Sequence, residues 1–352
     1  MTPRLLFVCP DISEPSGGLK QIYRQVDILN SYGYTALVVH QKQGFSPQWF
    51  DHETPTTYHY LLHAELNNQP ASKPQWYVKL REAQFSKNDL IIQDTDILIF
   101  PEVYGPRITE VFSSNFKVIY NQGCYQALQE FPIDVSAKKV PYNHPKVLAS
   151  LVNSDDAMGY MHYLFPKHPT FKIRHSIDTN QFQSATHKKK QILYMSRKNH
   201  ADIKQVLQMN SLRGNLAHWE LIDIDHFTHA DVSKAMQESS IFLSSNLDEG
   251  FGLPAIEAIA SGCIVIGYPG KGGKEYFKED FTMAIPEKNI LLFAKKLEEV
   301  IKQIEKNPNY WNSQTDLGRN FVAKNYNEML EKLDMEVAWN FILEKYNENI
   351  DA

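Results

Sequence analysis

The chain has 352 residues, a length that favours two domains of ordinary size. Hydrophobic residues make up 43% of it and charged residues 22%, which excludes a disordered chain. Lys and Arg number 36 against 41 Asp and Glu, a net charge of −5, so the chain lacks the basic excess of a nucleic-acid-binding protein and we expect no nucleic-acid partner.

No apolar run approaches the ~18–20 residues of a membrane-spanning helix, and the apolar stretch near the N-terminus is too short for a secretory signal. The three cysteines, Cys9, Cys124 and Cys263, lie far apart and form no CxxC pair. Reduced, packed thiols are the expected state of such residues. The sequence therefore predicts a soluble, cytoplasmic protein.

Short, mostly continuous apolar runs alternate with helical patterns along most of the chain. The predicted strands are residues 5–9, 36–40, 97–100, 118–121, 147–153, 192–195, 220–224, 241–244 and 263–267, and the predicted helices are 20–31, 203–212, 232–239 and 290–304. Continuous apolar strands are typical of parallel sheets that helices cover on both faces. The expected fold class is therefore α/β, with doubly wound sheets.

Two segments interrupt this alternation. Residues 41–87 are polar and rich in Pro, His and aromatic residues such as Trp76 and Tyr77, and we interpret them as an elaborated connection suited to substrate binding. Residues 166–190 contain two prolines and a run of lysines, with one strand-like stretch at 171–177. We expect the domain boundary in this second segment.

The C-terminal residues carry a further helical pattern. Apolar residues recur at positions 322, 326, 330, 333, 337 and 341, which predicts one amphipathic helix. The predicted organisation is a first domain of residues 1–170, a second of 171–325, and a terminal helix of 326–352.

The most informative segment runs from Asp248 to Gly262, with the sequence DEGFGLPAIEAIASG. A loop of Gly250, Phe251, Gly252 and Leu253 precedes a helix whose first turn contains Pro254. Glycines let a backbone approach a ligand closely, and the free N–H groups of a helix start donate to phosphate.

Two carboxylates flank this loop, Glu249 before the helix and Glu257 on its expected first turn. Carboxylates accept hydrogen bonds from sugar hydroxyls, so the pattern suits a phosphorylated polyol. Taken singly, each glutamate is more often a solvated residue than a functional one, and Gly-Phe-Gly is compatible with an ordinary turn.

Glu-x7-Glu, Gly-Phe-Gly-Leu-Pro and Glu-Ala-x-Ala-x-Gly together resemble the donor-site signature of retaining glycosyltransferases of the GT-B type, in the large family 4 (glycosyl transferases group 1). The resemblance implies two Rossmann-like domains facing across a cleft, with a C-terminal helix that crosses back to the first domain. It also implies a nucleotide-sugar donor bound mainly on the second domain, a saccharide or lipid-linked acceptor on the first, and no cofactor or metal.

Other positions take roles from the same resemblance. Gly17 and Gly18 resemble the family's N-terminal glycine loop, although a glycine pair before a helix is more often only a turn. Arg197 and Lys198 follow the first strand of the second domain, where the family keeps a basic pair for the diphosphate. Lys204 is the alternative second cation, and Lys198 is favoured. The family's hinge motif is matched only in part, by residues 175–178.

One position departs from the family pattern. Gln122 stands where many relatives carry a His close to the reacting sugar, and an amide can donate a hydrogen bond but cannot take a proton. A retaining mechanism needs no protein base if the leaving phosphate accepts the proton. Glu102, which follows the preceding strand, is the candidate acceptor-side carboxylate, with a solvated loop residue as the competing interpretation.

Several patterns that suggest metals are discounted. The DxD pairs lack further oxygen ligands, the spaced histidines lack a third ligand, and residues 270–275 lack the spacing of a phosphate-binding P-loop. The residues concerned are Asp94, Asp96, Asp223, Asp225, His59, His63, His226 and His229.

The expected activity is transfer of a sugar, with retention, in the assembly of a bacterial surface polysaccharide or glycolipid. By resemblance, Glu249 holds hydroxyls of the donor sugar and Glu257 those of the ribose, and peripheral contact with the inner membrane surface is compatible with such a role. Two alternatives stay open: a sugar-nucleotide epimerase of the same architecture, and a catalytically idle binding subunit. The missing His at position 122 and the complete Glu-x7-Glu loop favour transfer over epimerisation.

Overall fold

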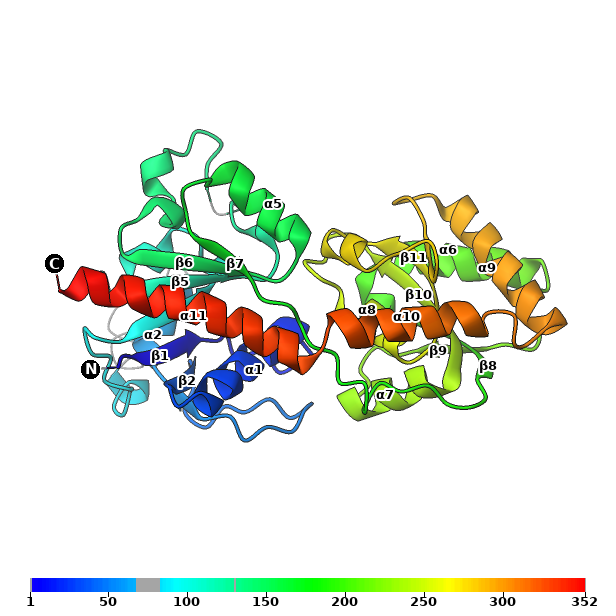
Figure 1. The fold of residues 1–352 in the computed structure, drawn as a ribbon, viewed down its shortest axis with the longest axis horizontal. Helices are drawn as coiled ribbons and strands as arrows, with labels where there is room; N and C mark the ends of the chain where they lie inside the picture. The colour runs from blue at the N-terminus through cyan, green and yellow to red at the C-terminus, as the bar shows by residue number, and fades with distance from the viewer. Residues whose placement is uncertain (1, 68–82, 130, 352) are drawn as a thin grey trace. The chain divides into compact units, whose positions relative to one another are not determined.

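The computed structural model describes residues 2–67, 83–129 and 131–351. The chain divides into two compact units (Figure 1). The first comprises Met1–Asn153, Ala157–Ile173 and Lys332–Ala352, and the second comprises Ser154–Asp156 and Arg174–Glu331. Trp76 and Tyr77, which were assigned to a substrate-binding connection, lie outside the described residues.

The first unit is built on a seven-stranded parallel sheet in the order β3-β2-β1-β4-β5-β6-β7. Its strands are β1 Arg4–Val8, β2 Thr35–His40, β3 Thr56–Tyr58, β4 Ile97–Pro101, β5 Phe116–Asn121, β6 Val147–Val152 and β7 Thr170–Lys172. Its helices are α1 Gly17–Ser31, α2 Tyr60–Asn67, α4 Arg107–Glu110, α5 Asp155–Leu164 and most of α11 Glu328–Ile350.

Helices cover both faces of this sheet. On one face, buried side chains of α1 such as Leu19 and Val26 share a core with Met335 and Trp339 of α11. On the other face, α2, α4 and α5 pack against the opposite sides of the same strands. The central strands β4, β5 and β6 are buried at every residue, which explains why their apolar runs are continuous rather than alternating.

The second unit is built on a five-stranded parallel sheet in the order β12-β11-β10-β8-β9. Its strands are β8 Lys189–Tyr194, β9 Glu220–Asp223, β10 Ser239–Asn246, β11 Ile264–Pro269 and β12 Thr282–Ala284. Its helices are α6 His200–Leu212, α7 His229–Glu238, α8 Leu253–Ala260, α9 Ile290–Lys306 and α10 Asn312–Asn325. Side chains of α7, α8 and α10 form the core on one face, and α6 and α9 form it on the other.

All nine predicted strands are present, and the strand-like stretch at 171–177 overlaps β7, but the sequence missed β3 and β12. Each of these two has only three residues and lies at an edge of its sheet. An edge strand is covered less completely than a central one, so it does not need the apolar run on which the prediction depended.

The prediction of one C-terminal amphipathic helix is wrong. Two helices, α10 and α11, are separated at Tyr326 and Asn327. Within α11 the predicted stripe residues Leu333 and Val337 are 50% and 54% exposed, because the break changes the rotational phase of the second helix. The buried face instead consists of Met335, Ala338, Trp339, Ile342 and Tyr346.

The expectation that the C-terminal helix returns to the first unit is confirmed. The Tyr346 hydroxyl donates to the Thr95 carbonyl oxygen at 2.7 Å, and the Tyr32 hydroxyl donates to the Lys332 carbonyl oxygen at 2.9 Å. In Figure 1, α11 crosses the strands of the first sheet, on the face that also carries α1.

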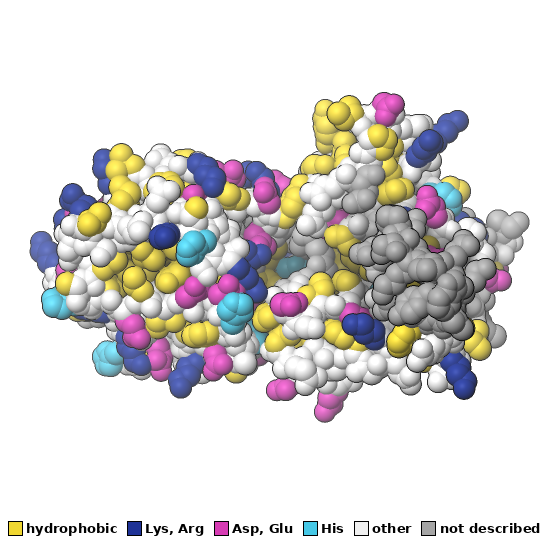
Figure 2. Space-filling view, turned by 180° about the vertical axis from the view of Figure 1, so that it is seen from behind, with side chains coloured by type: hydrophobic (Ala, Val, Ile, Leu, Met, Phe, Trp, Pro, Cys, Tyr) yellow, Lys and Arg dark blue, Asp and Glu magenta, His cyan; other side chains and the backbone are white. Residues whose placement is uncertain are grey.

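The surface carries charges of both signs. On the face shown in Figure 2, Lys and Arg side chains are interspersed with Asp and Glu among the described residues, in keeping with the net charge of −5. In the described parts of the chain, no helix has the length and apolar character needed to span a membrane.

Candidate functional site

Each sheet contains one point where the strand order changes direction, and the predicted site residues follow the strands at these points. In the first sheet, β1 and β4 are neighbours and the chain winds outward from them to both sides. In the second sheet, β8 and β10 have the same relation. Ligands of doubly wound sheets bind outside the carboxyl ends of the strands at such a switch point.

In the second unit, a 3₁₀ turn of Ser196–Lys198 follows β8. The carboxylate of Asp223 holds this turn, since its Oδ1 accepts from the Ser196 amide at 3.2 Å and from the Asp225 amide at 3.0 Å. Burial raises the pKa of Asp223, but hydrogen bonds from the Ser196 side chain and from the amides of Asp225 and Ser196, together with the nearby His200, outweigh burial and lower it overall. Arg197 pairs with Asp225, its Nε lying 3.4 Å from Oδ1. The turn therefore fixes a permanent cation at the carboxyl edge of the sheet.

The structure brings Lys198 and Glu249 together. Lys198 Nζ donates to Glu249 Oε1, and both side chains remain partly exposed. Lys204, the alternative second cation, lies on an exposed position of α6. Of the two lysines, it is Lys198 that contacts the loop after β10.

That loop has a conformation that only glycine adopts without strain. Gly252 has φ +85°, and a Cβ on it would lie 2.9 Å from the Tyr276 hydroxyl oxygen. The Tyr276 hydroxyl contacts the carbonyl oxygens of Phe251 and Gly252 at 2.8 and 2.7 Å. The loop that contains Gly272 packs against the 250–253 loop, since a Cβ on Gly272 would lie only 1.8 Å from the Gly250 carbonyl oxygen. No local pattern in the sequence indicates that a buried tyrosine holds the predicted donor loop in place.

Phe251 is not presented to a ligand as a side chain. Its ring is buried in the core of the second unit, in contact with the rings of His175, Tyr276 and Tyr326. The predicted contribution of Phe251 to the donor site, through its backbone amide, stays a prediction. Leu253 begins α8, whose first N–H groups have no intrahelical acceptor and remain at the carboxyl edge of the sheet.

Glu257 does not lie on the first turn of α8, as predicted, but at its fifth position. It is buried rather than solvated, and its Oε1 lies 3.7 Å from His229 Nε2. His229 Nδ1 in turn contacts Gln181 Nε2 at 2.9 Å, which fixes the imidazole ring beside the carboxylate.

In the first unit, the predicted glycine pair and Gln122 lie together. Gly17 and Gly18 are the first residues of α1, which Ser16 caps by accepting from the Leu19 amide at 3.4 Å. Gln122 Nε2 donates to the Gly18 carbonyl oxygen at 2.9 Å. A Cβ on Gly18 would lie only 1.9 Å from Gln122 Oε1, so position 18 requires glycine while this amide is in place.

Glu102 is neither a solvated loop residue nor a carboxylate presented to an acceptor. It is 2% exposed, and its two oxygens accept from the amides of Gln122 at 3.0 Å and Gly123 at 2.7 Å. Burial raises its pKa to about 7 against the opposing effect of these hydrogen bonds. Glu102 therefore holds the backbone that carries Gln122, and the acceptor-side assignment is corrected to a positioning role.

Sequence reasoning missed Asn153, which follows β6 directly. Its Nδ2 donates to the Gln122 carbonyl oxygen at 2.9 Å. Its Oδ1 is buried and finds no hydrogen-bond partner among the residues described. A polar residue as the last member of the predicted strand at residues 147–153, at its carboxyl end, is the signal that could have identified it.

A cavity of about 490 Å³ lies at the switch point of the first sheet. It is lined by Pro10, Ile12, Leu66, Asn67, Val103, Tyr104, Pro106 and Arg107. The buried hydroxyl of Tyr104 has no hydrogen-bond partner within the described part of the chain. The lining therefore combines apolar surface with a phenol and a guanidinium group.

The residues that suggested metal sites have other partners. Asp96 is buried and accepts from Arg4 Nε at 2.8 Å, Asp94 accepts from Ser114 at 2.9 Å, and His63 Nε2 contacts the Val39 carbonyl oxygen at 3.0 Å. No group of three or more His, Cys, Asp or Glu residues in residues 2–67, 83–129 and 131–351 is arranged to hold a metal ion.

Comparison with known proteins gives a family match in the second unit. Residues 222–317 match the family model described as Glycosyl transferases group 1. Over 118 residues the chain is 29% identical to an alpha-1,6-glucosyltransferase of Actinobacillus pleuropneumoniae, a match that covers 32% of this chain and only 36% of that relative.

Solved structures are similar along nearly the whole chain. Sucrose-phosphate synthase from Thermosynechococcus elongatus has a TM-score of 0.66 at 13% identity, covering 97% of this chain and 99% of that one. HepE from Anabaena, in complex with UDP, has a TM-score of 0.62 at 13% identity, covering 96% and 99%. The fold is GT-B. Two Rossmann-like parallel-sheet units and a C-terminal helix that returns to the first unit match the GT-B expectation from the sequence, which is confirmed.

Proposed function

We propose that this GT-B protein is a retaining glycosyltransferase of family 4 that uses a nucleotide-sugar donor. The observation that carries the proposal is the arrangement at the switch point of the second sheet. There Arg197, the Lys198–Glu249 ion pair and the 250–253 loop follow two neighbouring strands. The group 1 family match, which covers the loop, supports the same activity.

The chemistry requires stabilisation of the negative charge that builds on the leaving nucleoside diphosphate. Arg197 supplies a permanent cation with a fork that matches phosphate oxygens, and the amides at the start of α8 supply uncharged donors. Both are fixed before the donor binds, so they cost little reorganisation during the reaction.

The Lys198–Glu249 pair suggests how the donor is accommodated. Without a donor, each side chain compensates the charge of the other. On donor binding, Lys198 would turn to the diphosphate and Glu249 would accept from hydroxyls of the sugar. Glu257, held beside His229, would accept from the ribose. The pair thus separates into two binding groups: the lysine gains an anionic partner, and the carboxylate gains hydroxyl donors in place of the ammonium group.

No proton acceptor is assigned to the first unit. Gln122 has no basic nitrogen, and both oxygens of Glu102 accept from backbone amides. The leaving phosphate would therefore accept the proton of the acceptor hydroxyl, with Gly17, Gly18 and Gln122 close to the reacting groups. On this proposal turnover needs no metal ion.

The acceptor would bind the first unit, and the cavity lined by Tyr104 and Arg107 is the candidate for its reacting end. Its mixed apolar and polar lining suits a saccharide or a lipid-linked saccharide. We place the reaction in the assembly of a bacterial surface polysaccharide or glycolipid, at the cytoplasmic face of the membrane, where the protein would make only peripheral contact.

The test is incubation with a panel of nucleotide sugars and acceptor extracts, with and without EDTA. We expect release of nucleoside diphosphate, undiminished by EDTA, and a product whose anomeric coupling in proton NMR matches that of the donor. Glu249→Gln should lose turnover, while Asp248→Asn, at the exposed neighbouring position, should keep it.

Three other outcomes would contradict the proposal. Appearance of the donor's 2-epimer would indicate an epimerase, and no release with any donor would indicate an idle binding subunit. A product of inverted configuration would exclude the retaining mechanism.

A further inference from the structure

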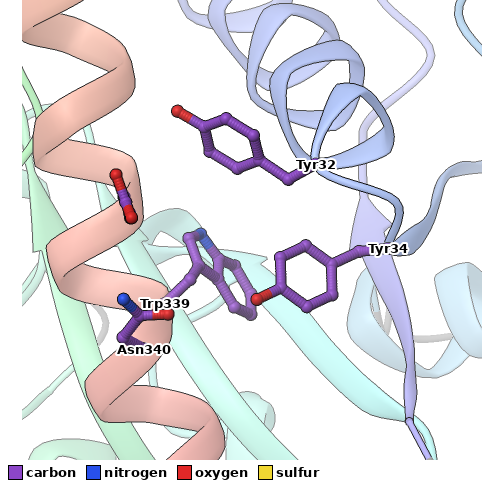
Figure 3. A pocket seen from close by; sticks show the side chains of 5 residues that line it. Tyr32, Tyr34, Trp339 and Asn340 are labelled. Atoms are coloured by element: carbon purple, nitrogen blue, oxygen red, sulfur yellow. The ribbon is translucent and has the colours of Figure 1, made fainter.

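The first unit contains a second cavity, remote from the carboxyl edge of its sheet. It has a volume of about 280 Å³ and is lined by Tyr32, Tyr34, Glu336, Trp339 and Asn340 (Figure 3). Tyr32 lies at the C-terminal end of α1, and Gly17 lies at its start. At 1.5 Å per residue, the helix separates the cavity from the glycine pair by roughly 20 Å.

The indole of Trp339 contributes an unused hydrogen-bond donor. Trp339 is 1% exposed, and its Nε1 is without a hydrogen-bond partner among the described residues. Figure 3 shows the nitrogen turned toward the side of the cavity where the Tyr32 ring lies. A buried indole N–H normally has an acceptor, so this one marks a place for an acceptor atom from a ligand.

The remaining lining residues offer acceptors and ring surface. Glu336 and Asn340 are exposed positions of α11 that supply carboxylate and amide groups. Tyr32 is 40% exposed, and one hydrogen bond, to the Lys332 carbonyl oxygen, holds its hydroxyl over the cavity. Partial burial and the negative charge of Glu336 raise the pKa of Tyr32, in keeping with a carboxylate that faces this phenol.

We propose that this cavity is a second ligand site, which binds a neutral saccharide unit. The Trp339 N–H donates to one hydroxyl oxygen of the sugar, and the Glu336 carboxylate accepts from another hydroxyl. The phenol rings of Tyr32 and Tyr34 cover the C–H groups of the sugar ring. The cavity volume is that of a small ligand site, with room for a single hexose.

The lining argues against the two charged ligand classes that aromatic pockets commonly take. An anion would be repelled by Glu336 and would meet no cation among the five lining residues. A quaternary ammonium would suit the carboxylate, but it has no acceptor for the indole N–H, and the edge of an aromatic ring carries positive charge. A sugar hydroxyl both donates and accepts, so it satisfies both groups.

The proposed glycosyltransferase activity would use this site to bind part of the acceptor. If the first unit binds a saccharide acceptor, a site about 20 Å from the glycine pair would hold a distant unit of a growing chain. This role rests on the proposed function, whereas binding of the saccharide does not.

The test observes the indole N–H groups directly, in nitrogen–proton NMR spectra of the full-length protein. The chain has five tryptophans, and Trp339→Phe identifies the signal of interest. Glucose, galactose, N-acetylglucosamine and maltotriose are titrated, with choline chloride and sodium sulfate as charged probes. We expect a neutral sugar to move the Trp339 signal saturably, and Trp339→Phe and Glu336→Gln to weaken sugar binding about fivefold or more.

Trp311 provides the matched control. Its Nε1 is also buried and unpartnered within the described part of the chain, but it lies in the second unit and lines none of this cavity. Trp311→Phe should leave sugar binding unchanged. Arg197→Ala, which should impair donor binding, should also leave the sugar-induced shift intact, so failure of the proposed activity would not be mistaken for failure of this site.

Three results would overturn the proposal. They are an unmoved Trp339 signal with all four sugars, a shift with choline or sulfate alone, and a sugar-induced shift that persists unchanged in Glu336→Gln. If Trp339→Phe fails to fold, Asn340→Ala takes its place. This change, at an exposed position next to Trp339, should shift the Trp339 signal and so identify it, and it must also weaken sugar binding.

Discussion

Glu102 and Glu249 both follow a parallel strand at a switch point, yet their surroundings give them different roles. Glu249 is partly exposed and compensated by a lysine that can move away. Glu102 is buried, and its two oxygens accept from the amides of Gln122 and Gly123. The first is suited to exchange its partner for a ligand, and the second to hold a backbone in place.

Glu102 should make stability depend on pH. Burial raises its pKa to about 7, from a usual value of 4.5, so between these values the folded state holds a proton that the unfolded state has lost. Stability from this group is present below pH 4.5 and is lost as the pH rises through 7. Relative to Glu102→Gln, the wild type should lose about 2 kcal/mol of unfolding free energy between pH 5 and pH 8, measured by urea denaturation.

The control is Glu110→Gln, a change at an exposed position of α4. Its stability should differ from wild type by the same small amount at both pH values. If the difference between wild type and Glu102→Gln is also the same at pH 5 and pH 8, Glu102 does not ionise in the way its burial implies.

For single residues, the sequence was sufficient to locate those that directly follow a strand. The strands before Arg197, Lys198 and Glu249 are recognisable as apolar runs. The sequence could therefore place these residues at one sheet edge, where the structure also has them. It misplaced Glu257 on the first turn of α8, and it could not show the burial of Phe251 and Glu257, which depends on side chains distant in the sequence, Tyr276 and His229. No local pattern reports such contacts.

Among the helices and strands, the central strands were predictable from the sequence, and the rotational phase of α11 was not. The apolar positions at 333 and 337 continue the spacing of those in α10, but the two-residue break rotates α11 so that other residues face the core. The face of α11 that is buried in the core consists of Trp339 together with Met335, Ala338, Ile342 and Tyr346. Spacing alone cannot reveal such a break, because it assumes an uninterrupted helix.

Two truncations on α11 distinguish the observed face from the predicted one. Ile342→Ala removes a fully buried side chain of the first unit and should cost about 2–4 kcal/mol of unfolding free energy. Val337→Ala, on the exposed side, should change it by less than about 0.5 kcal/mol. Urea denaturation monitored by circular dichroism measures both, and a larger loss in Val337→Ala would reverse the assignment of the face.

At the scale of the whole molecule, the chain leaves the first unit and returns to it at its end. Residues 332–352 complete a core whose strands come from the first half of the sequence. The repeated apolar runs predicted two α/β domains, whereas the return of the last helix to the first unit was an implication of the family resemblance. The integrity of the first unit therefore depends on α11.

Deleting residues 332–352 should destabilise the first unit and spare the second. We expect the unfolding transition of the first unit to disappear or to move to much lower temperature in calorimetry. The transition of the second unit should still rise on addition of a nucleoside diphosphate, since a ligand that binds only the folded state stabilises it. Loss of that response on deletion would show that nucleotide binding depends on α11.

Calorimetric titration with UDP, GDP, dTDP and CMP measures whether the second unit binds the diphosphate of a nucleotide sugar. One nucleotide should bind, and Arg197→Ala should weaken it by about 1.5–3 kcal/mol, the size of a charged hydrogen bond. Lys204→Ala, which removes an exposed cation of α6, should leave the affinity unchanged. Equal affinity in wild type and Arg197→Ala, or no binding of any of the four nucleotides, would contradict the account.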